Sequence, residues 1–88
     1  MQVEFLEKFG KDLDKVNQGF VKTAVQKTII RVEQATNLNE IPQLKKLAGH
    51  KSAYRIRVGD YRIGIFVDGN RVQFARVANR KDIYKVFP

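Results

Sequence analysis

The chain has 88 residues, with 17 Lys and Arg against 9 Asp and Glu, which gives a formal net charge of +8 and a length suited to one domain, residues 1–88. Because it contains no cysteine and a single histidine, disulfides and a Cys–His catalytic pair are excluded, and a structural zinc site nearly so. No apolar run is long enough to cross a bilayer and no signal peptide begins at Met1, so we expect a cytoplasmic protein without a membrane partner.

The first half of the chain is expected to be helical. Residues 2–6 fit either a short strand or a first helical turn. Apolar side chains then recur every three or four positions and predict an amphipathic helix over 6–16, which Asn17-Gln18-Gly19 interrupts. An apolar stripe predicts a second helix over about 20–36, and Pro42 prevents its simple continuation.

The second half changes to the period of strands. Apolar side chains alternate with others over 54–58 and again over 62–67, with a turn at Gly59-Asp60 between them. Asp68-Gly69-Asn70 predicts a hairpin turn into a third strand over 72–77.

Two points in this half stay open. The inward face of the third strand is ambiguous, because Phe74 and Val77 have opposite parity. Residues 83–87 fit either a short final strand or a docked tail.

The predicted fold class is therefore α+β: two N-terminal helices packed on one face of a small antiparallel sheet. The helices would cover an apolar row made of Ile56, Ile63 and Ile65. The opposite face would carry a basic row made of Arg55, Arg57 and Arg62.

The net charge is confined to one half of the chain. Residues 1–44 carry six basic and six acidic side chains, whereas residues 45–88 carry eleven basic and three acidic ones. An asymmetry of this size predicts that the second half binds a polyanion or an acidic protein. A surface that serves only solubility is the alternative.

The chemistry available to the chain is that of arginine and tyrosine. The sequence has neither GxGxxG nor GxxxxGK[ST], and the three Asp of the second half are scattered. An Arg fork suits a backbone phosphate and the extra charge of a phosphoryl-transfer transition state, and a tyrosine can stack on a base or donate a proton. RNA cleavage by the neighbouring 2′-hydroxyl fits this set, and in principle it needs no metal or cofactor.

The same residues also fit ordinary structural positions. Arg55 and Arg57 could be solvated on an open sheet face, and Tyr84 could be a packed terminal aromatic. Composition alone makes ordinary surface residues of Lys45, Lys46, Arg80 and Lys81.

Three segments resemble a known family. They are Leu44–Gly49, Tyr54–Ile63 and Asn79–Tyr84, and the run YRIRVGDYRI in the second is the most specific. With the two-helix section, they resemble the RelE/ParE superfamily of bacterial toxins from toxin–antitoxin systems over essentially the whole chain. The resemblance implies two N-terminal helices against a curved antiparallel sheet. Its RelE branch cleaves messenger RNA, often in the ribosomal A site, without metal.

The resemblance also implies site residues and partners. Arg55 and Arg57 would contact RNA phosphates. Three residues would be catalytic: Arg62 would stabilise the scissile phosphate, Tyr84 would stack on or protonate the cleaved nucleotide, and Arg80 is the basic residue just before it. The remaining expected RNA contacts are Lys45, Lys46, Arg76 and Lys81. A cognate antitoxin would wrap an acidic or amphipathic segment around the toxin, and operator DNA would be bound only through that antitoxin.

Departures from the family pattern leave alternatives open. Many relatives have a histidine where this chain has Asn79. They often have a further basic residue upstream, at a position that falls near Ala78 in this chain, although Arg76 could partly replace that residue. The chain could therefore be a weakened, antitoxin-bound member. It could also be a gyrase inhibitor like the ParE branch, or a plain nucleic-acid binder.

Overall fold

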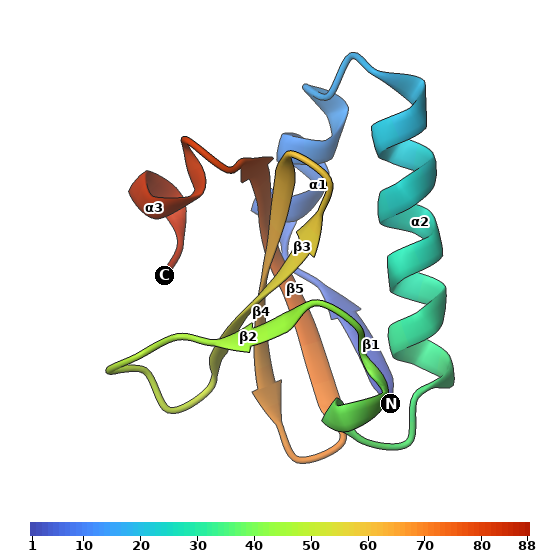
Figure 1. Ribbon diagram of the computed structural model, residues 1–88, viewed down its shortest axis with the longest axis vertical. Helices are drawn as coiled ribbons and strands as arrows, with labels where there is room; N and C mark the ends of the chain where they lie inside the picture. The colour runs from blue at the N-terminus through green and yellow to red at the C-terminus, as the bar shows by residue number, and fades with distance from the viewer.

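A five-stranded sheet with helices on both of its faces makes up the computed structural model, which describes residues 1–88 (Figure 1). In chain order the elements are β1 (Gln2–Phe5), α1 (Glu7–Asp14), α2 (Gly19–Gln34), the 3₁₀ turn η1 (Leu38–Glu40), β2 (Leu44–Lys46), β3 (Ala53–Val58), β4 (Tyr61–Asp68), β5 (Arg71–Asn79) and α3 (Ile83–Val86). The α+β class predicted from the sequence is confirmed. None of the helices is both long and apolar enough to cross a membrane.

The sheet is mixed rather than wholly antiparallel, which corrects the expected topology. Its strand order is β1-β5-β4-β3-β2, and β1 pairs in parallel with β5 while the other pairs are antiparallel. The pairing of β1 sets Val3 beside Val72 and Phe5 beside Phe74. The ammonium group of Met1 also donates to the carbonyl oxygen of Ala35 at 2.6 Å, at the C-terminus of α2, where a positive charge is favourable.

A β-bulge resolves the ambiguous face of β5. Ile65 pairs with Phe74, but the preceding Gly64 pairs with Arg76, so Ala75 is an extra residue on β5. The bulge reverses the alternation, and Phe74 and Val77 therefore join the same core cluster despite their opposite parity.

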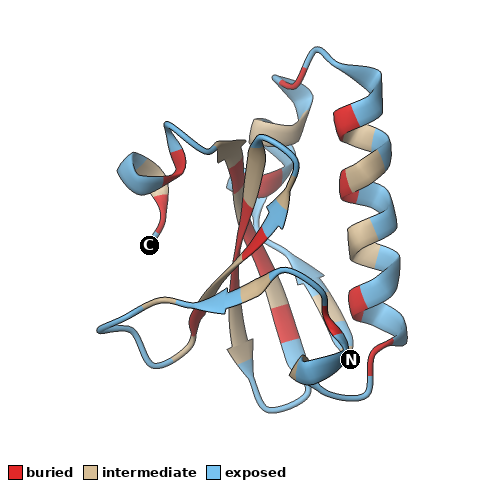
Figure 2. Cartoon of the chain, in the orientation of Figure 1, coloured by how far each residue is buried: buried red, intermediate tan, exposed pale blue.

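The main core lies between the sheet and the first two helices (Figure 2). α1 packs chiefly on β5, and α2 contacts β1 and β3. The three isoleucines predicted to face the helices are buried there, none of them more than 1% exposed: Ile56, Ile63 and Ile65.

The C-terminal segment forms a second, smaller core on the opposite face. Residues 83–87 are a docked tail with one helical turn, α3, rather than a strand. Ile83 and Phe87 are buried there with Ala53 and Ala75. This docking places α3 beside the basic row of the sheet.

Candidate nucleic-acid interface

A cleft of about 330 Å³ opens on the face of the sheet that carries α3. We call it the basic cleft, and its lining residues are Gln43, Leu44, Lys45, Arg55, Arg57, Arg62 and Tyr84. Strand register explains why its cations meet. Arg57 pairs with Arg62, and Arg55 pairs with Lys45, so β2, β3 and β4 each bring a positive charge to the same place.

The four cations of the basic cleft have no carboxylate partner. The four ion pairs of the structure involve Lys11, Arg71, Arg76 and Lys85, none of which lines the cleft. Like charges held so close are destabilising unless an anion joins them. The geometry therefore suits a polyanionic ligand.

Arg62 is held in place by the β3–β4 turn. One of its guanidinium nitrogens, Nη1, donates to the carbonyl oxygens of Gly59 at 2.8 Å and Tyr61 at 2.9 Å. The other two nitrogens have no acceptor within the protein. A guanidinium oriented this way keeps donors free for a phosphate.

Tyr84 closes the cleft from α3. Its ring lies against the guanidinium of Arg55, with 4.6 Å between the Arg55 Cζ and the ring centroid. The side chain is otherwise open, since Tyr84 is 72% exposed. The pKa of its hydroxyl is lowered, mainly because Arg55 offers a hydrogen bond and its positive charge, with smaller contributions from Lys45 and Arg62.

The neighbouring lysines of β2 point to opposite faces. Lys45 lines the basic cleft, whereas Lys46 pairs with Tyr54 on the helix-covered face and lies 5.5 Å from the centroid of that ring. The ammonium group of Lys46 donates to the carbonyl oxygens of His50 and Lys51, which closes the loop after β2. Lys46, although predicted as an RNA contact, is therefore not brought into the cleft.

Arg76 is also kept away from the cleft, by an ion pair with Asp12. Its Nε and Nη2 donate to the two carboxylate oxygens of Asp12 at 2.7 and 3.0 Å. The bond to Asp12 raises the pKa of Arg76, and the side chains are only 21% and 12% exposed. The sequence named Arg76 as an expected RNA contact, but the structure does not bring it to the cleft lining. Local sequence could not reveal this ion pair, because Asp12 lies 64 residues away.

Arg80 and Lys81 lie in the exposed turn that joins β5 to α3, outside the cleft lining. Asn79 shapes this turn, because its side-chain oxygen accepts from the backbone N–H of Lys81 at 3.0 Å. The backbone N–H of Arg80 donates to the carbonyl oxygen of Asp60 at 2.7 Å. The structure thus gives Asn79 a turn-forming position.

Sequence reasoning missed Gln43 and Leu44 as lining residues. Gln43 adopts a φ of 63°, and its carbonyl oxygen accepts from the backbone N–H of Arg57 at 3.1 Å. The only sequence signal was Pro42, which marked an irregular segment but not its direction. No three His, Cys, Asp or Glu side chains come together as metal ligands would.

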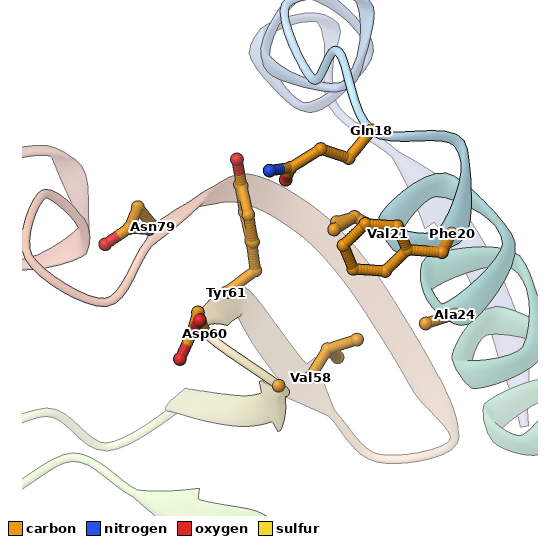
Figure 3. Close-up of a pocket in the computed structure, with 9 residues that line it drawn as sticks. Gln18, Phe20, Val21, Ala24, Val58, Asp60, Tyr61 and Asn79 are labelled. Carbon is orange, nitrogen blue, oxygen red and sulfur yellow. The ribbon is translucent and has the colours of Figure 1, made fainter.

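A second hollow, of about 200 Å³, lies between the start of α2 and the β3–β4 turn (Figure 3). Phe20, Val21 and Val58 supply its apolar wall, and Gln18, Asp60 and Asn79 are among its polar lining. It contains no Lys or Arg, so it does not continue the basic cleft.

Comparison with known proteins identifies the relatives of this chain. The family model described as ParE toxin of type II toxin–antitoxin system, parDE, matches residues 3–84. The chain is 42% identical over 89 residues to Toxin RelE3 of Methanocaldococcus jannaschii, with 100% of both chains covered.

Solved structures agree with this match. The RelB–RelE antitoxin–toxin complex from Methanococcus jannaschii superimposes with a TM-score of 0.82 at 40% identity, covering 97% of this chain and 99% of the other. The intact RelBE toxin–antitoxin complex of E. coli gives a TM-score of 0.70 at 21% identity, covering 89% and 94%, which supports the shared fold.

Proposed function

The chain belongs to the RelE/ParE family and is a toxin of a type II toxin–antitoxin system, and from that premise we propose that it is an endoribonuclease cleaving messenger RNA on the ribosome. A cognate antitoxin is its partner. The observation that carries the proposal is the basic cleft, in which four cations without carboxylate partners meet one exposed tyrosine.

The proposed reaction is attack of a substrate 2′-hydroxyl on the adjacent phosphorus. The P–O5′ bond breaks as the new P–O2′ bond forms, the proton of the 2′-hydroxyl passes to water, and the leaving O5′ takes up a proton, which leaves a 2′,3′-cyclic phosphate and a 5′-hydroxyl. Arg62 faces the phosphate and stabilises the charge that develops on its oxygens. Because the nucleophile comes from the substrate, the step requires no metal in principle.

The remaining cleft residues hold the RNA. Arg55, Arg57 and Lys45 bind the phosphates that flank the cleaved bond. Tyr84 stacks on the nucleotide or donates its proton to the leaving O5′. Arg80 and Lys81, on the turn before α3, are more distant contacts to RNA or ribosome.

The test is cleavage of a short message in the presence and absence of ribosomes, with product ends mapped by primer extension. We expect cuts at the A-site codon only when ribosomes are present. Arg62→Ala should lower the cleavage rate by about 10²–10³-fold, as loss of one charge-stabilising donor does elsewhere. Full activity in a folded Arg62→Ala protein would remove Arg62 from the mechanism.

Two substitutions separate the possible functions of Tyr84. Tyr84→Phe keeps the ring and removes the proton, whereas Tyr84→Ala removes both. If Tyr84 is the proton donor, both variants lose about 10²–10⁴-fold. If it acts by stacking, Tyr84→Phe stays active and Tyr84→Ala does not. Lys27→Gln, on the exposed surface of α2, is the control and should cleave like the unchanged protein.

Gyrase inhibition is the second candidate, because the family model that matches this chain is that of the ParE toxins. It predicts DNA breaks with intact transcripts and no dependence on Tyr84. Growth arrest without RNA cleavage in either reaction would favour it. Absence of both growth arrest and RNA cleavage would favour a weakened, antitoxin-bound member. Asn79 and Ala78 are then the positions at which to restore the residues of the family pattern.

A further inference from the structure

Tyr84 depends on its neighbours for its position. The helix that carries it, α3, has only four residues, and so short a helix is not stable by itself. Tyr84 is exposed, but Ile83 beside it is 0% exposed and Phe87 three residues later is 5% exposed. Burial of these two side chains on the sheet therefore fixes where the phenol lies.

Phe87 is seated directly on Gly64 of β4. A Cβ atom at position 64 would lie 2.4 Å from the Cγ of Phe87 and 2.5 and 2.6 Å from the two Cδ atoms. Gly64 does not have the positive φ found at three other glycines, so its backbone conformation is open to other residues. The absence of a side chain at position 64 is thus explained by the ring that occupies the space.

The contact between Phe87 and Gly64 adjoins the basic cleft. Gly64 pairs across the strands with Arg55, the residue whose guanidinium lies against the Tyr84 ring. Phe66 also packs against the Phe87 ring, with 5.1 Å between the two ring centroids. A shift of Phe87 would therefore move α3 relative to Arg55.

We propose that Gly64 and Phe87 are a positioning pair for the cleft: packing of the Phe87 ring on Gly64 holds Tyr84 against Arg55. Neither residue lines the cleft, so both act through Tyr84. The effect on catalysis rests on the proposed function, whereas the effect on the position of Tyr84 does not.

The test is Gly64→Ala, read by NMR. We expect loss of the nuclear Overhauser contacts between the Tyr84 ring and the Arg55 side chain, because the new Cβ displaces the Phe87 ring. Gly10→Ala is the matched control, since a Cβ there meets nothing within 4 Å, and it should keep those contacts. Retention of the contacts in a folded Gly64→Ala protein would overturn the proposal.

Phe87→Ala decides the question where Gly64→Ala fails to fold. Phe87 belongs to the smaller cluster, so the thirteen-residue main core is left intact. We expect the same loss of Tyr84–Arg55 contacts in Phe87→Ala, whereas Phe87→Leu, which keeps a bulky apolar group on Gly64, should retain more of them. Unchanged contacts in Phe87→Ala would also overturn the proposal.

A double substitution tests whether the two residues act as one unit. If Gly64→Ala acts only through the ring, it should add nothing in a Phe87→Ala background. Independent, additive losses of the contacts would contradict the pairing.

Cleavage kinetics complete the test. Gly64→Ala and Phe87→Ala should each lower kcat by about 10²-fold, as a misplacement of about 1 Å can, and no further than Tyr84→Ala. KM should change little, since Arg57 and Lys45 still hold the RNA. If the Tyr84–Arg55 contacts are lost but kcat is unchanged, the positioning proposal stands and the proposed catalytic function of Tyr84 is refuted.

Discussion

At the scale of single residues, the surroundings of Tyr84 change the acidity of its hydroxyl. Arg55, and to a lesser extent Lys45 and Arg62, lower the pKa of its hydroxyl because they favour the phenolate. Absorbance titration of the phenolate should therefore give Tyr84 a pKa below the ordinary tyrosine value of about 10. Arg55→Gln should raise it again. Subtraction of the Tyr84→Phe curve removes the signals of Tyr54 and Tyr61, the other two tyrosines.

The same shift sets a pH dependence for cleavage. A proton donor must be protonated, so activity should fall as pH rises through the pKa of Tyr84. Because that pKa is lowered, the fall should come at a lower pH than for an ordinary tyrosine, and Arg55→Gln should move it to higher pH. Rates across the alkaline range give the result. If activity falls at the same alkaline pH in Arg55→Gln as in the unchanged protein, Tyr84 is not the proton donor.

At the scale of elements, Asp12 of α1 completes the edge of β5. β1 pairs only with Arg71–Phe74, and beyond it the backbone N–H of Val77 donates to the Asp12 carboxylate at 3.1 Å. The same carboxylate holds Arg76. One acidic side chain thus replaces a missing strand neighbour and joins α1 to the sheet.

Removal of this carboxylate should lower the stability of the fold. Asp12→Ala leaves the partly buried Arg76 without its partner, and we expect the free energy of unfolding to fall by about 2–4 kcal/mol in urea titrations. Glu7→Gln on the same helix is the control. Its ion pair with Lys11 is exposed, so the change should stay below about 1 kcal/mol. Equal losses in the two variants would contradict this account of Asp12.

Local periodicity explains which elements and residues could be predicted. Alternation predicted β3 and β4 and placed Arg55, Arg57 and Arg62 on one face, as the structure has them. It could not reveal the bulge at Ala75 or the parallel pairing of β1, since both depend on partners distant in sequence.

The same limit applies to the site. The pairing of Arg76 with Asp12 and the seat of Phe87 on Gly64 are contacts between distant segments. Lys46 could not be separated from Lys45, because β2 has only three residues and shows no period of its own.

At the scale of the whole molecule, charge is segregated between the two halves of the chain. Residues 1–44, which include both long helices, are neutral, and residues 45–88, which include the cleft strands, carry the net +8. An anionic partner is therefore attracted to the sheet side in preference to the helix side. For an antitoxin or an RNA alike, approach is oriented before any specific contact forms.

This segregation makes the salt dependence of RNA binding a test of the whole arrangement. Each phosphate neutralised on a single strand contributes about 0.7 to the log–log slope, so the four cations of the cleft predict a slope of about −3. Lys45→Gln with Arg57→Gln removes two of them without touching the Arg55–Tyr84 contact, and should reduce the slope by about 1.4. Lys27→Gln with Arg31→Gln removes the same charge from the exposed side of α2 and should leave the slope unchanged. A 2′-O-methylated oligonucleotide, which lacks the attacking hydroxyl, allows binding to be measured without cleavage. Equal reductions in the two double variants would mean that net charge alone, and not the cleft, attracts the RNA.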